Sequence, residues 1–139
     1  MFLALIIAVI IYMRIEAGML KVKRVYFTKK KACLKIVHIS DIHIKKLKVS
    51  QSRIAEAIRN EKPDIVIATG DYIEKPGQAE DFFEFFKRTL NGYRVIMCLG
   101  NHDYKSFRGD DKGLAQFVRS LESLGATVLD NKSFCFEKY

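Results

Sequence analysis

Three short runs rich in Val and Ile recur along the chain, and each ends in polar residues that can bind a metal ion. The runs cover residues 34–40, 64–69 and 94–99, followed by Asp41-Ile42-His43, Gly70-Asp71 and Gly100-Asn101-His102-Asp103. Such runs are typical of buried parallel strands, and functional groups gather at the carboxyl ends of parallel strands. Asp41, Asp71 and Asn101 are thirty residues apart, about the length of one strand–helix–strand unit. The sequence therefore predicts that these side chains converge at one edge of a sheet.

The segments between and after these runs show the spacing of amphipathic helices. Helices are predicted over residues 50–61, 78–90 and 111–124, with Asp110 and Asp111 at the start of the third. Phe82, Phe85 and Phe86 share one face of the second helix, which predicts core packing. Further strands are expected over residues 126–129 and 133–136, and a basic edge strand over residues 20–27. This alternation predicts an α/β fold with a parallel-rich sheet and covering helices.

Charge is concentrated in the first quarter of the chain. The 139 residues are 49% hydrophobic and 29% charged, which is typical of a globular domain. Of the net charge of +8, residues 1–35 carry +7 and the remainder +1. A nucleic-acid-binding domain more often spreads positive charge over its folded face. Nucleic acid is therefore not expected as a partner, except as a substrate.

Residues 1–13 are apolar, although about 20 residues are normally needed to span a bilayer. Three interpretations remain open: a membrane anchor, an uncleaved signal-like segment and a buried helix. The basic lead-in over residues 14–33 favours the anchor, because Lys and Arg beside an apolar segment bind an anionic membrane surface. The expected location is the cell membrane, with the side of the membrane left open.

Several other residues carry weaker signals. Cys33, Cys98 and Cys135 lack metal-site spacing and are expected to be small buried side chains in a reducing compartment. His38 lies inside the first strand and is predicted to be buried and hydrogen-bonded. A cluster of lysines follows the first motif and is interpreted mainly as a solvated loop, with attraction of an anionic substrate as the alternative. These lysines are Lys45, Lys46 and Lys48.

The three motifs, intact and in order, resemble those of the calcineurin-like metallophosphoesterase superfamily, and the lead-in resembles its membrane-associated phosphodiesterase branch. The resemblance covers about residues 34–139 and implies the front half of a four-layer α/β/β/α sandwich. The family's later histidines are absent, because His38, His43 and His102 are the only histidines in the chain. The resemblance therefore implies the amino-terminal part of a longer, truncated enzyme, with a partial catalytic domain over residues 34–139.

The resemblance implies hydrolysis of a phosphate ester with two divalent ions, which would be Mn, Fe or Zn. Asp41 and His43 would bind one ion, Asp71 would bridge the pair, and Asn101 would bind the second. In the family, the histidine that matches His102 lies at the phosphate and assists the leaving oxygen. Asp103 is expected to hydrogen-bond His102 and to fix its tautomer.

The main alternative is a non-enzymatic, membrane-associated fragment that folds partially and binds one metal weakly. The missing histidines support this alternative, because each neutral imidazole is a strong ligand for Mn, Fe or Zn.

Overall fold

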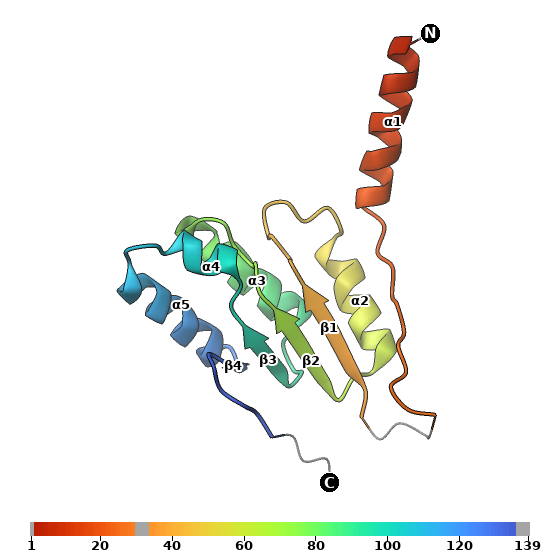
Figure 1. Cartoon of the computed structure of the whole chain (residues 1–139). Coiled ribbons are helices and arrows are strands. Elements are labelled where there is room, and N and C mark those ends of the chain that lie inside the picture. Colours follow the sequence, from red (N-terminus) through yellow and green to blue (C-terminus); the bar gives the residue numbers. More distant parts are fainter. Residues whose placement is uncertain (1, 30–33, 136–139) are drawn as a thin grey trace.

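The structure, a computed structural model, describes residues 2–29 and 34–135 and contains one four-stranded parallel sheet (Figure 1). Its strands are β1 (Ile36–Ser40), β2 (Ile65–Thr69), β3 (Val95–Cys98) and β4 (Ala126–Val128). Their spatial order is β1-β2-β3-β4, so each strand pairs with its neighbour in sequence. The four principal predicted strands are therefore present within one or two residues of their expected ends.

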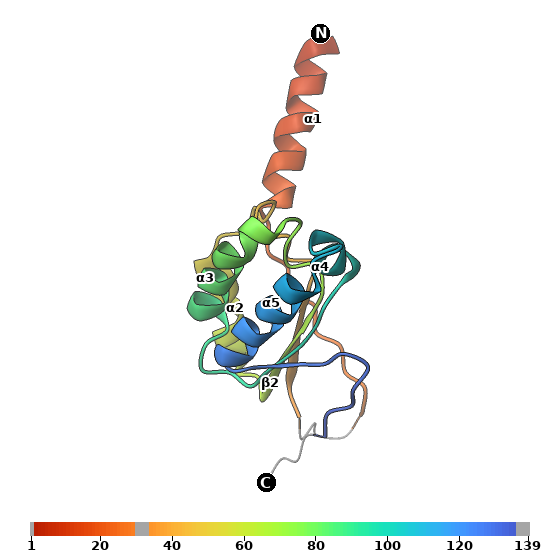
Figure 2. The same cartoon turned by 90° about the vertical axis from the view of Figure 1, so that its left-hand side faces the viewer.

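The three longer helices between the strands lie on one face of the sheet (Figure 2). They are α2 (Gln51–Glu61), α3 (Ala79–Thr89), which follows a short 3₁₀ turn η1 (Pro76–Gln78), and α5 (Asp111–Ser123). Connections between parallel strands are almost always right-handed, so a sheet in sequential order receives all its helices on the same face. The predicted α/β class, with a parallel sheet and covering helices, is confirmed.

Residues at the helix ends account for the helix boundaries. The side chain of Ser50 accepts a hydrogen bond from the backbone N–H of Arg53 at the start of α2. Lys62 ends that helix in a left-handed conformation, directly before Pro63. Asp110 caps α5 by accepting from the N–H of Gly113 at 2.9 Å, as expected, whereas Asp111 is the first helical residue. Such caps contribute about 1 kcal/mol each.

The hydrophobic core lies between the sheet and these helices. Register pairs Val66 with Val95 and Ala68 with Met97, and all four side chains face the helices and are buried. From α3, the predicted aromatic face is fully buried in the same core. Its members are Phe82, Phe85 and Phe86, joined by Phe83 and by Phe117 of α5. Burial of each large apolar side chain contributes about 1.5–3 kcal/mol, so this core fixes the sheet beneath the motifs.

The opposite face of the sheet is more open, and His38 lies on it. Ile36, His38 and Ser40 alternate on this face of β1 and are exposed. A ring nitrogen of His38 lies 2.7 Å from Oγ1 of Thr69, so the predicted hydrogen bond is present. The prediction that His38 is buried was wrong, because β1 turns this side chain away from the helices.

Two weaker strand predictions were wrong. Residues 20–27 form no strand: they run alongside α2 and are held by side chains rather than by a strand ladder. Residues 133–135 are also irregular, and residue 136 lies outside the described part of the chain. Both segments lie outside the sheet, which ends at β1 on one side and at β4 on the other.

The two described cysteines differ in how far their side chains are buried. Cys98 in β3 is half-buried, whereas Cys135 is exposed, which contradicts the prediction of burial for that residue. Both are free thiols. Cys33 lies outside the described residues.

Helix α1 (Phe2–Ala17) projects from the domain and leaves its apolar side chains exposed. Figures 1 and 2 both show it extending beyond the packed sheet and helices. None of the helices formed by residues 2–29 and 34–135 combines the length and apolarity required to cross a membrane. Residues 2–13 are exposed and do not pack into the core of the described residues.

A segment that we call the strap, residues 18–24, joins α1 to the flank of α2. At the first turn of α2, Nη1 of Arg53 donates to the carbonyl oxygen of Gly18 at 3.1 Å. At the last turn, Nη2 of Arg24 donates to Oε1 of Glu61 at 2.5 Å. The strap is therefore pinned at both ends of the helix.

The ionisation of Glu61 should make the unfolding free energy depend on pH in the acidic range. Its buried carboxylate accepts hydrogen bonds from Arg24 and pairs with Lys35, and these contacts, led by the hydrogen bond from Arg24, lower the pKa of Glu61 to about 2. A carboxylate with a lowered folded-state pKa stabilises the fold above its unfolded pKa of about 4.3, and this contribution is lost as pH falls through the folded value. We expect Glu61→Gln to flatten the pH dependence of the unfolding free energy between about pH 4.5 and 2.

Denaturant unfolding at a series of pH values measures this effect. The matched control is Glu56→Gln, at an exposed position of the same helix. Equal changes in the pH dependence of the two variants would show that it does not arise from the contacts of Glu61 with Arg24 and Lys35.

Candidate metal centre

Backbone hydrogen bonds join the loops that follow the first three strands. The N–H of Asp41 donates to the carbonyl oxygen of Gly70 at 3.2 Å, and the N–H of His43 donates to that of Asp71 at 2.9 Å. The N–H of Gly70 in turn donates to the carbonyl oxygen of Cys98 at 2.9 Å. These bonds continue the sheet pairing past the strand ends, so the loop side chains are held at one edge, which we call the metal edge.

Five side chains at the metal edge form two overlapping groups of possible ligands. Asp41, His43 and Asp71 make one group, and His43, Glu74 and His102 make the other. Within each group, one donor atom per residue lies within 4.8 Å of the others. Donors on opposite sides of one ion are about 4 Å apart, because each metal–ligand bond is about 2.0–2.2 Å. Small side-chain movements would therefore bring either group into coordinating range.

Three of these residues have unusual backbone conformations. Asp41, His43 and Asp71 have φ angles of 52°, 40° and 57°, in the left-handed region. This region is uncommon for residues other than glycine and costs roughly 1–3 kcal/mol per residue. Its occurrence at three candidate ligands, held by the loop hydrogen bonds, is typical of a functional site.

The environment of His43 fits a bound cation. Its Nδ1 atom is buried and has no hydrogen-bond partner, although it lies 3.4 Å from Oε1 of Glu74. Its Nε2 atom lies 4.0 Å from Oδ2 of Asp71. A buried polar atom without a partner is costly, and a cation would satisfy it while neutralising the carboxylates nearby. The donor set of imidazole and carboxylate suits Zn, Mn or Fe.

Glu74 is a candidate that the motif pattern did not identify. It lies on the loop after β2, three residues beyond Asp71, and that spacing on one loop was the available signal. Its carboxylate accepts a hydrogen bond from Nζ of Lys46. This hydrogen bond is the largest cause that lowers the pKa of Glu74, to which His43 and His102 also contribute. Glu74 is thus a stable anion between two imidazoles.

The lysines after the first motif are partly engaged in the fold. Lys46 pairs with Glu74, and Lys45 pairs with Asp81 at 2.7 Å. Both lysines remain exposed, as the interpretation of a solvated loop expects, although each forms an ion pair at the surface. Lys48 is exposed.

The third motif reaches the site through helix α4 (Asn101–Ser106), which was not predicted from the sequence. The N–H of His102 donates to Oδ1 of Asp71 at 2.9 Å, so the peptide between Asn101 and His102 lies against that carboxylate. The ring of His102 meets the ring of His43 edge-on, with centroids 5.1 Å apart. Asn101 is exposed at the first position of α4. The structure thus brings all three motifs to the metal edge.

Asp103 does not have the expected hydrogen-bonding role. Its fully buried carboxylate accepts from four backbone N–H groups at 2.8–3.0 Å instead of orienting the ring of His102. The donors are Gly100, Asp71, Tyr72 and Ile73. Burial raises the pKa of Asp103, and the four N–H groups act in the opposite direction. Asp103 is therefore a brace between the second and third motif loops.

Two glycines allow these loops to touch. A Cβ atom built on Gly70, which has a φ of 55°, would lie 2.5 Å from Cα of Gly100. A Cβ atom on Gly100 would collide with the backbone nitrogen and the carboxylate of Asp71. Both motif glycines are needed because their neighbours occupy the space of a side chain.

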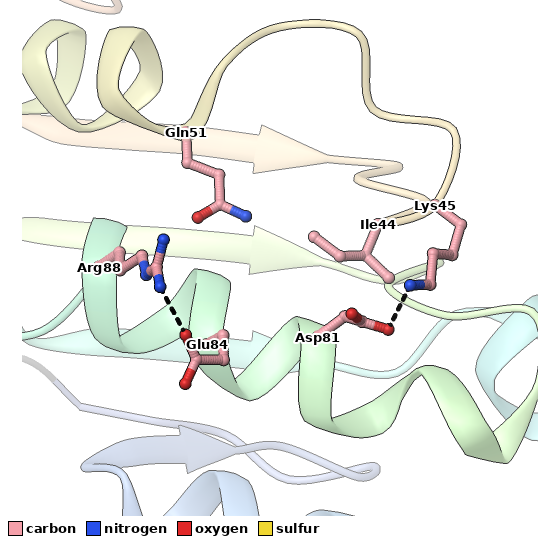
Figure 3. A pocket seen from close by; sticks show the side chains of 6 residues that line it. All are labelled: Ile44, Lys45, Gln51, Asp81, Glu84 and Arg88. Carbon is pink, nitrogen blue, oxygen red and sulfur yellow. Dashed lines mark hydrogen bonds and ion pairs between the residues drawn. The ribbon is translucent and has the colours of Figure 1, made fainter.

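A shallow pocket beside the metal edge is lined by charged residues that already pair with one another (Figure 3). It lies between the loop after β1, the start of α2 and the outer side of α3. Its lining residues are Ile44, Lys45, Gln51, Asp81, Glu84 and Arg88. Lys45 pairs with Asp81, and Arg88 pairs with Glu84 at 2.9 Å. None of the five grouped ligand candidates lines this pocket, so it is separate from the metal edge.

Comparisons with known proteins agree with this arrangement. Over 102 residues the chain is 26% identical to an uncharacterized metallophosphoesterase, YkoQ, of Bacillus subtilis, covering 71% of the chain and 37% of that protein. Over 85 residues it is 31% identical to the UDP-2,3-diacylglucosamine pyrophosphatase LpxG of Chlamydia trachomatis, covering 56% of the chain and 25% of that protein. No solved structure matches the chain.

The family comparison covers most of the chain. The model of the calcineurin-like phosphoesterase family matches residues 34–137, which include all three motifs. The chain therefore belongs to the calcineurin-like phosphoesterase family.

Proposed function

We propose that this chain carries part of a dinuclear metal centre that hydrolyses a phosphate ester. The observation that carries the proposal is the buried, unpartnered Nδ1 of His43 within two groups of metal-ligand side chains. Asp41, His43 and Asp71 would hold the first ion, while Asp71 and Asn101 would hold the second. Oδ1 of Asp71 is fixed by the N–H of His102, and Oδ2 faces His43. When bound, the two ions supply charge stabilisation and an activated water for attack on phosphorus.

His102 would handle the proton of the leaving oxygen. Its ring is half-buried, and one of its nitrogens belongs to the ligand group that includes Glu74. A ring N–H of His102 would donate this proton to the departing alkoxide. Asp103 would serve this step indirectly, by fixing the loop on which His102 lies.

We further propose that the remaining ligands come from outside these 139 residues. The chain spans 37% and 25% of the two curated relatives, and His38 lies within β1, where it pairs with Thr69. The first ion would have three protein ligands from this chain. The second ion would have only two, Asp71 and Asn101, because Asp71 is shared between the ions. The alternative, a non-enzymatic fragment that binds one metal weakly, predicts no hydrolysis with any complement of metal.

The proposed location is a membrane surface, with α1 as the anchor. The all-round apolar surface of α1 and the basic residues after it support this location. The name of the relative LpxG refers to a diacylated nucleotide sugar, and an acylated substrate of this kind held in a membrane is proposed for this chain as well.

The test compares Asp71→Asn with His102→Ala. We expect Asp71→Asn to lower Mn²⁺ or Zn²⁺ affinity by at least tenfold, because it removes the central negative charge. We expect His102→Ala to leave metal affinity within about threefold, and to lower turnover by about 10²–10⁴-fold in a complete enzyme. Calorimetric metal titration and hydrolysis of a generic phosphodiester measure the two quantities.

Asp111→Asn, at an exposed carboxylate on α5, is the matched control and should change neither quantity. Equal loss of metal in the Asp71 and His102 variants would contradict the separate roles. Metal binding without hydrolysis, even in a longer chain that supplies further histidines, would favour the non-enzymatic alternative.

A further inference from the structure

The strap fixes the base of α1 at the metal edge. Gly18, the residue after α1, accepts the hydrogen bond from Arg53 in the first turn of α2. That turn directly follows the loop that carries Asp41 and His43. The second pin, Arg24 to Glu61, lies at the far end of α2 and holds the strap along the helix. The position of α1 is therefore set by two contacts rather than by a free linker.

Both views show α1 and the metal edge at the same end of the domain. In Figure 1, the arrowheads of β1, β2 and β3 point toward the end from which α1 rises. In Figure 2, turned by 90°, α1 again leaves that end of the domain. The chain near residue 135 lies at the opposite end. The direction of α1 is thus also the direction in which the candidate ligands face.

The surface of α1 fits a bilayer better than a protein groove. A helix that docks on a protein shows one apolar stripe, whereas α1 is apolar on all sides apart from Arg14 and Glu16. Phe2 and Tyr12 are 77% and 63% exposed. Sixteen residues extend about 24 Å at 1.5 Å per residue, which is a substantial depth in a hydrocarbon core of about 30 Å.

Basic residues lie on the elements next to the base of α1. They are the exposed residues Arg14 on α1, Lys21 in the strap, Lys48 on the loop before α2, and Arg53 on α2, while Glu16 on α1 carries the opposite charge. Basic residues beside a membrane surface are attracted to anionic lipid. This charge selects an anionic bilayer as the occupant.

We propose that α1 inserts into an anionic bilayer and that the strap then turns the metal edge toward the lipid headgroups. The substrate class that follows is a phosphate ester of a membrane lipid, presented at headgroup depth. This inference rests on the proposed phosphoesterase function for its substrate, but its geometry can be tested without activity.

The geometric test uses the full chain with its three cysteines replaced and one new cysteine labelled with a fluorophore. Lys48→Cys reports the metal edge, and Asn91→Cys reports the opposite end of the sheet, before β3; both positions are exposed. Vesicles contain anionic lipid and a headgroup spin label that quenches nearby fluorophores. We expect quenching at position 48 to exceed that at position 91 by at least threefold.

Equal quenching at the two positions, or stronger quenching at position 91, would overturn the orientation. Flotation with the vesicles reports insertion separately, and failure to float would overturn the proposal at its first step. An Arg24→Ala, Arg53→Ala double variant removes both pins of the strap. It should still float, and the difference between the two labels should fall at least twofold; an unchanged difference would show that the strap does not orient the domain.

The substrate arm compares one headgroup phosphate ester held in vesicles with the same ester in soluble form, using a metal-loaded chain that includes the further histidines. Preference for the vesicle-held ester by tenfold or more supports the inference. Equal rates would overturn the substrate class while leaving the phosphoesterase function intact. Stronger quenching at position 48 than at position 91, together with no hydrolysis of either ester, would contradict the proposed function but not the proposed orientation.

Discussion

Replacing Asp103 with alanine is expected to destabilise the domain by about 3–5 kcal/mol, because it leaves four buried backbone N–H groups without their acceptor. Each hydrogen bond to a charged group contributes about 1.5–3 kcal/mol, partly offset by the desolvation of the carboxylate itself. Total stability of a domain is about 5–15 kcal/mol, so much of it would be lost. Thermal unfolding should show a midpoint lowered by about 10–20 °C.

Two further variants distinguish the loss of the hydrogen bonds to Asp103 from a simple loss of negative charge. Asp103→Asn keeps one carbonyl oxygen but turns an amide NH₂ toward two N–H donors, so it should also be strongly destabilised. Asp111→Ala removes an exposed carboxylate from the first turn of α5 and should cost less than about 1 kcal/mol. A small effect of Asp103→Ala, similar to that of Asp111→Ala, would contradict the role of Asp103 as a brace.

Replacing Gly100 with alanine should damage the metal edge. The new Cβ would lie 2.9 Å from Cγ of Asp71 and closer still to its backbone nitrogen, which cannot move away as a flexible side chain could. Overpacking of this kind costs about 1–3 kcal/mol. Displacement of Asp71 should also lower Mn²⁺ or Zn²⁺ affinity by at least tenfold. Unfolding and calorimetric titration measure these effects.

Gly77→Ala is the matched control for this substitution. A Cβ at position 77 would meet no atom within 4 Å, and its backbone is not in the left-handed region. We expect stability within about 0.5 kcal/mol of the original chain and unchanged metal affinity. Similar results for the two alanine variants would show that the approach of Gly100 to Asp71 does not limit the site.

The parts of the fold that could be predicted are those set by local pattern. Val- and Ile-rich runs, helical spacing and end residues such as Ser50 and Asp110 identified the strands and the three connecting helices. The expected parallel direction of the strands then placed the motifs at one edge, because the carboxyl ends of parallel strands lie at the same edge of a sheet. The convergence of Asp41 and Asp71 followed from that order.

The parts that could not be predicted depend on tertiary neighbours. Asp103 follows His102 in sequence, which suggested a partnership with that ring, yet its carboxylate binds N–H groups some thirty residues away. Glu74 became a candidate ligand only when the loops brought it to His43. The exposure of His38 depends on which face of β1 the helices cover. Sequence shows which side chains are present, whereas these roles depend on what packs beside them.

The sequential strand order has a consequence for how the domain is made. Ile36 pairs with Ile65, Val66 with Val95 and Val95 with Ala126, so partners are always about thirty residues apart. Parallel pairing over this distance requires a loop to close for each strand, and a domain generally folds as one unit. The motif loops should therefore become ordered together, once β3 has docked on β2. Metal affinity should appear at that point, when Gly100 and Asp103 come against the loop of Asp71.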